Sequence, residues 1–89
     1  MIYEFRWNAW NREHIDRHGV SEGEAEFVVS GARAPYPQKV GHGKYLVRGP
    51  TAAGSYIQVI YIFDPEDVVY VIHARPLSDR EKKQYRRRR

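Results

Sequence analysis

The sequence contains no cysteine and no long hydrophobic run, and these absences exclude several kinds of protein. Without a thiol, the chain forms no disulfide, holds no metal through thiolates and has no cysteine nucleophile. Its apolar stretches fall well short of the roughly 20 residues that a membrane-spanning helix needs. The first residues also lack the basic start and apolar core of a signal peptide. We therefore expect a soluble cytoplasmic protein without a membrane partner.

The signatures of several enzyme classes are missing as well. No Gly-Lys-Ser or Gly-Lys-Thr follows the glycines at positions 41, 43 and 49, so a phosphate-binding loop is not indicated. The chain has no Gly-x-Ser-x-Gly elbow and no carboxylate pair placed for glycosidase chemistry. His14 and His18 are four residues apart on a predicted helix, but no third ligand has a recognisable spacing. We expect packing and a contact at the helix C-terminus to explain these two histidines, and we expect no metal or other cofactor.

Positive charge is concentrated at one end of the chain. Residues 78–89 hold seven of the 15 Lys and Arg residues and two of the 11 Asp and Glu residues. Residues 1–77 hold the other eight basic and nine acidic groups, so this part of the chain is nearly neutral. A cationic terminal element on a near-neutral body favours a positioned contact with a polyanion. The run Arg86 to Arg89 has a second explanation, because cations at a helix C-terminus complement the helix dipole.

The N-terminal third of the chain predicts a strand followed by two helices. Residues 2–7 alternate between the two faces, with an aromatic side chain at every second position, which is typical of a half-buried strand. Asn8 is a helix cap, and Gly19 ends the first helix where a left-handed residue is needed. Ser21 with Glu24 forms a capping box and begins a second helix. This second helix is expected to bury Ala25, Val28 and Val29 and to end near Gly31.

The rest of the chain predicts three or four mostly antiparallel strands and a final helix. Pro35 and Pro37 limit residues 33–40 to an edge strand at best. Further strands are expected over residues 44–48, 56–63 and 68–75, with a turn at 64–67. The second of these is almost continuously apolar, as expected of a strand covered on both faces. Ser78 with Glu81 is another capping box. Residues 1–89 thus predict one α+β domain, a small twisted sheet with helices packed on one face.

His73 and Arg75 are the strongest candidates for a reactive site. They lie two apart at the end of a predicted strand, so their side chains share a face. An imidazole transfers protons near neutral pH, and a guanidinium holds a phosphate in a bidentate fork. The pair therefore suits phosphodiester chemistry. The alternative is structural: His73 hydrogen-bonds a core carbonyl, and Arg75 pairs with Asp79 or Glu81.

Other basic and aromatic residues are candidates for the same chemistry. Lys44 and Arg48 share a strand face and would neutralise a phosphate or a pentavalent intermediate if that face is open. A cationic edge strand that resists aggregation has the same pattern. Tyr85 either stacks on a base or anchors the final helix on the sheet. The residues expected to bind RNA phosphates are Lys82, Lys83, Arg86 and Arg87.

Three segments carry a resemblance to a known family. They are Trp7 with Asn-Arg-Glu-His-Ile-Asp-Arg-His-Gly-Val at 11–20, Lys-Tyr-Leu-Val-Arg-Gly at 44–49, and Ile-His-Ala-Arg at 72–75 with Arg-Glu-Lys-Lys-Gln-Tyr at 80–85. Together they resemble the toxin subunit of the BrnT/BrnA type II toxin–antitoxin systems, in the RelE-like superfamily. The resemblance implies a RelE-like fold and a ribonuclease that cleaves messenger RNA without a metal, through attack of the 2′-hydroxyl on the adjacent phosphate. It also implies a hetero-oligomer with a cognate antitoxin that has a ribbon-helix-helix DNA-binding domain.

The resemblance assigns catalytic roles by position. Arg75 and Arg48 would stabilise the transition state, with Tyr85 and Lys44 in support. The family often has Ser-Ala-Arg-Lys where this chain has His73-Ala-Arg-Pro, and an acidic residue before the position of Lys44. The general base therefore stays open: either His73 replaces a missing group, or this chain has weak or no nuclease activity. The alternative function is an RNA-binding, DNA-binding or antitoxin-docking module of the same fold without catalysis.

Overall fold

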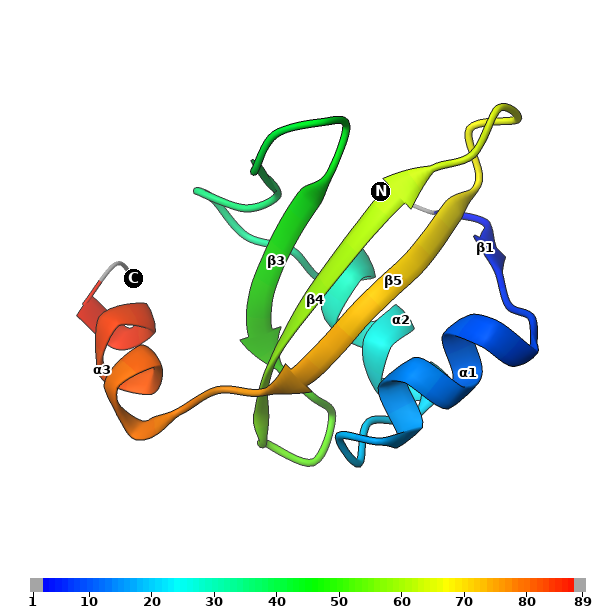
Figure 1. The fold of residues 1–89 in the computed structure, drawn as a ribbon. Helices are drawn as coiled ribbons and strands as arrows, with labels where there is room; N and C mark the ends of the chain where they lie inside the picture. Colours follow the sequence, from blue (N-terminus) through cyan, green and yellow to red (C-terminus); the bar gives the residue numbers. More distant parts are fainter. Residues whose placement is uncertain (1–2, 88–89) are drawn as a thin grey trace.

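A short strand, two helices, four further strands and a final helix follow one another along residues 3–87, the part of the chain that the computed structural model describes (Figure 1). The elements are β1 (Phe5–Arg6), α1 (Ala9–Asp16), α2 (Glu22–Ser30), β2 (Gln38–Lys39), β3 (Tyr45–Pro50), β4 (Tyr56–Phe63), β5 (Val69–Pro76) and α3 (Asp79–Arg87). This order confirms the predicted α+β architecture. The expectations for Ile2, Arg88 and Arg89 lie outside the described residues.

The strands form one sheet in the order β1-β5-β4-β3-β2. Strands β2 to β5 pair antiparallel, as predicted, whereas β1 pairs parallel to β5. In Figure 1, α2 lies behind the long strands. Helix α1 lies on the β5 side of the sheet, and α3 lies on the β3 side. The edge strand predicted within residues 33–40 is β2, which is only two residues long. The candidate residues of the sheet, Arg48, His73 and Arg75, lie on β3 and β5, the two strands that flank β4.

The predicted starts of the first two helices are confirmed by their hydrogen bonds. The backbone N–H of Asn11 donates to the side chain of Asn8 at 3.2 Å, and the N–H of Asn8 donates to the side chain of Asn11 at 2.8 Å. Ser21 and Glu24 make the same reciprocal pair at 3.1 and 2.9 Å. Helix α1 ends at Asp16, and a turn then leads to Gly19, whose φ of 72° is the expected left-handed conformation.

The core lies between α2 and the sheet. The α2 side chains expected inside, Ala25, Val28 and Val29, are all buried, together with Val47, Val59, Val71 and Ala74 of the sheet. One expectation was wrong, because β4 is not covered along both of its faces. Val59 and Tyr61 are buried beneath the helices, whereas Ile60 and Ile62 on the other face are only partly buried. The reason is that the helices leave much of this second face, which we call the outer face, without a covering element (Figure 1).

Candidate active site

A β-bulge in β5 places His73 and Arg75 on the outer face of the sheet. Val71 is buried in the core, and regular alternation would turn residue 73 to the same side. The register against β4 shifts by one residue at this point, so Ile72 is an extra residue. Alternation is reversed beyond it: Ala74 is buried, and His73 and Arg75 lie opposite the core. The bulge thus determines where both candidate side chains project.

Arg48 and Arg75 meet because both are neighbours of Gln58. Gln58 lies on β4. It pairs with Arg48 of β3 on one side and with Arg75 of β5 on the other. With neighbouring strands about 4.8 Å apart, the two arginines stand about 10 Å from one another on the same face. Nε of Arg48 donates to Oε1 of Gln58 at 3.0 Å, which fixes one guanidinium against the strand between them. We call Arg48 and Arg75 the arginine pair.

The arginine pair converges on the carboxylate of Glu81 in the first turn of α3. Arg75 binds it through both terminal nitrogens, each at 2.8 Å. Arg48 donates to the same carboxylate through Nη2 at 3.1 Å. Two cations from the strands on either side of β4 therefore hold one anion between them, in the fork geometry that carboxylates and phosphates share. The ion pair of Arg75 with Glu81, one of the alternatives for Arg75, is present.

The charges at this site stabilise one another. The hydrogen bonds from Arg75 hold the pKa of the Glu81 carboxyl far below its usual range, with further help from the backbone N–H of Ser78. The same hydrogen bonds raise the pKa of the Arg75 guanidinium. The side chains of the three residues are one-fifth to one-third exposed, so water reaches the cluster. The arginine pair therefore binds one carboxylate, is partly exposed to solvent and keeps an excess of positive charge.

The arginine pair retains unused hydrogen-bond donors. A guanidinium has five N–H groups, and Arg75 uses three of them, two on Glu81 and one on the carbonyl of Pro76. Within residues 3–87 its remaining two N–H groups have no partner. Arg48 also lines a hollow of about 210 Å³ together with Arg33, Phe27 and Tyr85. The pair can therefore accept a second anion beside Glu81.

His73 lies next to this cluster and against a second imidazole. The rings of His73 and His18 are 5.5 Å apart between centroids and cross at 62°. Burial lowers the pKa of His73, and the neighbouring His18, Arg75 and His14 lower it further. This direction favours the uncharged form of His73, which is the form that accepts a proton.

The sequence predictions did not place His18 in the site, because they explained it by packing and a contact at the helix C-terminus. That expectation fits His14, which stacks on Trp10 with ring centroids 4.0 Å apart. His18 instead lies beyond the end of α1, is exposed, and reaches β5. The sequence did place His18 directly before Gly19, where the first helix was expected to end. A side chain at a helix end can project away from the helix and contact a neighbouring element.

Two other residues implied by the resemblance are not part of this cluster. Tyr85 is buried, and its ring lies 5.6 Å from that of Tyr56 and 6.2 Å from that of Tyr36. This geometry supports the anchoring alternative for Tyr85. Lys44 is exposed and precedes β3, four residues and about 13 Å along the strand from Arg48.

The cationic residues of α3 are spread around the helix. Lys82 lies 3.9 Å from Asp79, and the guanidinium of Arg86 lies 5.8 Å from the ring centre of Tyr56. Lys82 and Arg86 also line a groove of about 500 Å³ beside the β3–β4 loop. Lys83 and Arg87 are exposed. The four predicted RNA-binding residues therefore lie on a helix whose first turn carries Glu81.

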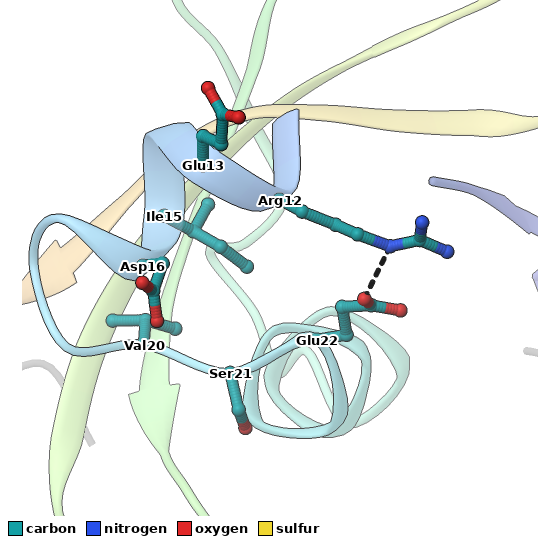
Figure 2. A pocket seen from close by; sticks show the side chains of 7 residues that line it. All are labelled: Arg12, Glu13, Ile15, Asp16, Val20, Ser21 and Glu22. Atoms are coloured by element: carbon teal, nitrogen blue, oxygen red, sulfur yellow. Dashed lines mark hydrogen bonds and ion pairs between the residues drawn. The ribbon is translucent and has the colours of Figure 1, made fainter. Parts of the chain in front are cut away.

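A further hollow, of about 320 Å³, lies between α1 and α2, away from the arginine pair (Figure 2). A hydrogen bond of 2.7 Å from Arg12 to Glu22 spans its rim, and its apolar lining is Ile15 and Val20. None of the catalytic or RNA-binding candidates lines it. We therefore place the candidate active site at the arginine pair and His73.

Residues 3–87 contain no group of three or more His, Asp or Glu residues placed to hold a metal ion. None of the helices in this range has the length and apolar character needed to cross a membrane. Comparison of the chain with protein-family models, curated proteins and solved structures gives no match.

Proposed function

We propose that this chain is a metal-independent endoribonuclease that acts on messenger RNA in the cytoplasm, as the toxin of a type II toxin–antitoxin pair. The observation that carries the proposal is the convergence of Arg48 and Arg75 on one anion, on the sheet face that also carries His73. The alternative is a module of the same fold that binds nucleic acid without cleaving it, which the occupation of the arginine pair by Glu81 favours.

The proposed reaction uses the 2′-hydroxyl of RNA as the nucleophile. His73 accepts its proton, and the 2′-oxygen attacks the adjacent phosphorus. Negative charge grows on the phosphate oxygens, where the free N–H groups of the arginine pair stabilise it. Glu81 holds the two guanidinium groups in place, so they need no rearrangement during the reaction. Exposed Lys83 and Arg87 attract the neighbouring phosphates.

The proposal includes a protein partner, a cognate antitoxin with a ribbon-helix-helix DNA-binding domain. This part rests on the resemblance of the three sequence segments described above. It is supported by the partly buried apolar residues of the outer face, Leu46, Ile60 and Ile62, which a bound polypeptide would cover together with the arginine pair. Toxin and antitoxin then form a hetero-oligomer in which the site is closed.

Expression of the chain alone in a bacterial host tests the proposal. We expect growth arrest with loss of full-length messenger RNA, and recovery of growth when Arg75→Ala or Arg48→Ala is expressed instead. Arg12→Ala is the matched control, because Arg12 is exposed and pairs with Glu22 away from the arginine pair. Arrest that persists unchanged in both arginine variants would show that the arginine pair does not carry the activity. Binding of RNA without cleavage would favour the non-catalytic alternative.

A further inference from the structure

We propose that His18 is the general acid of this site, acting on the leaving group while His73 acts on the nucleophile. The inference deepens the proposed ribonuclease function and rests on it. It assigns a catalytic role to the turn after α1, from which neither the sequence pattern nor the family resemblance drew a catalytic residue. The observation that carries the inference is that the imidazole of His18 lies edge-on to that of His73 on β5, with 5.5 Å between the ring centroids.

The backbone around His18 is fixed although its side chain is exposed. Its N–H donates to the carbonyl of Ile15 at 3.1 Å, and the N–H of Val20 donates to the same carbonyl at 3.2 Å. Ile15 and Val20 are both buried in the core. Gly19 supplies the left-handed residue that turns the chain between them. This turn places the exposed imidazole at a defined position beside β5, which a group that donates a proton requires.

The two imidazoles have different surroundings, which suits different roles. His73 is half-buried, and the ionisable groups that act on it are His14 of α1, His18 in the turn after α1, and Arg75 of β5. Each of these groups is cationic when protonated, so they favour the uncharged form of His73 and its use as a base. The side chain of His18 is exposed, so a substrate can reach its imidazole.

The reaction balances with these two groups alone. His73 takes the proton from the 2′-hydroxyl, and the 2′-oxygen forms a bond to phosphorus. The bond from phosphorus to the 5′-oxygen breaks with its electron pair, and His18 gives this oxygen a proton. The products are a 2′,3′-cyclic phosphate and a 5′-hydroxyl end. Exchange with water then returns both imidazoles to their starting forms.

A substrate with a sulfur leaving group tests this role. The probe is a set of oligoribonucleotides with randomised bases around one linkage, in which the 5′-bridging oxygen is either kept or replaced by sulfur. A thiolate is a much weaker base than an alkoxide and leaves without a proton. We expect His18→Gln to slow cleavage of the oxygen substrate by about 10²–10⁴-fold. The same variant should cleave the sulfur substrate nearly as fast as the unchanged protein, whereas His73→Gln should be slow on both.

The controls separate this inference from the proposed function. His42→Asn changes an exposed histidine in the turn before β3 and should leave both rates unchanged. His14→Gln should also keep both rates, and rescue by sulfur in this variant would give the role to His14 instead. Equal slowing of both substrates by His18→Gln, or no slowing, would overturn the inference while the ribonuclease function stands. If the unchanged protein cleaves neither substrate, the proposed function fails and this inference fails with it.

Discussion

Glu81 connects three elements through a single carboxylate. It binds Arg48 of β3 and Arg75 of β5, and it accepts a hydrogen bond from the backbone N–H of Ser78 at 2.8 Å. Its own N–H donates to the hydroxyl of Ser78 at 3.2 Å, which completes the capping box predicted from the sequence. The capping role was predictable because it is local. Its contact with two strands was not, because that depends on where α3 packs.

Replacement of Glu81 is expected to destabilise the fold. Glu81→Gln removes the charge that the arginine pair holds, so we expect the free energy of unfolding at pH 7 to fall by about 2 kcal/mol. Urea unfolding measures this change. Glu66→Gln, in the exposed β4–β5 turn, is the matched control and should have little effect. Equal stability of Glu81→Gln and the unchanged protein would show that the cluster contributes nothing to folding.

The same carboxylate predicts a dependence of stability on pH. The pKa of Glu81 is lower in the folded protein than its ordinary value of 4.5. The contribution of Glu81 to the free energy of unfolding is therefore complete above pH 4.5 and is lost as the pH falls below that value. Urea unfolding between pH 7 and pH 3 should give a steeper loss of stability for the unchanged protein than for Glu81→Gln. Parallel curves for the two proteins would contradict this assignment.

His73 gives a second prediction at the residue scale. Because burial, His18, Arg75 and His14 lower its pKa, its ring should titrate below the usual value of 6.5. His18→Gln removes one of these causes and should move the midpoint upward. NMR titration of the imidazole carbons measures both effects without any substrate, and His42→Asn serves as the control. A midpoint at or above 6.5 in the unchanged protein would argue against His73 as the general base.

At the scale of elements, the helix caps and the strand pattern were predictable, whereas the bulge in β5 was not. Alternation correctly places His73 and Arg75 on one face, because they are two residues apart. Which face it is depends on the extra residue at Ile72. A bulge forms through pairing with β4, and the composition of β5 alone gives no sign of it. The parallel pairing of β1 with β5 was missed for the same reason.

Helix α3 is held on the domain chiefly by Tyr85 and Glu81, and this predicts different effects for two substitutions. Tyr85→Ala removes the ring that packs near Tyr36 and Tyr56, so α3 should open more often. Tyr85→Phe keeps the ring and should preserve both the anchoring and the activity. Hydrogen exchange of the segment 79–87, compared with that of β4, measures the opening. Unchanged protection of α3 in Tyr85→Ala, or loss of activity in Tyr85→Phe, would contradict the anchoring role.

At the scale of the whole molecule, the excess of positive charge is concentrated at the C-terminal end of the chain. Residues 1–77 are nearly neutral, while the basic residues between positions 80 and 87 lie on a helix whose N-terminal turn reaches the candidate active site. The capping box of Ser78 and Glu81, together with the charge distribution, predicted this cationic helix. The sequence did not predict that His18, in the turn after α1, joins the same site, because that contact links residues 55 positions apart in the chain.

This arrangement predicts RNA binding that depends strongly on salt. The logarithm of the binding constant should fall linearly with the logarithm of the salt concentration. Replacing the exposed Lys83 and Arg87 by alanine should reduce the slope by about one to two, because fewer counterions are released. Replacing Arg12 and Lys39 changes the charge equally, away from α3, and is the control. An equal change of slope in both double variants would show that only the net charge of the protein matters for RNA binding. That result would contradict a specific role of α3.

The most direct test of the central claim is cleavage of RNA by the purified protein in excess EDTA. A messenger-like transcript and its 2′-O-methyl counterpart are incubated with the protein, and the product ends are analysed. We predict that the transcript is cut to 2′,3′-cyclic phosphate and 5′-hydroxyl ends, that the methylated RNA stays intact, and that Arg75→Ala cuts neither. A transcript that remains intact, or equal cutting of both RNAs, would contradict the account.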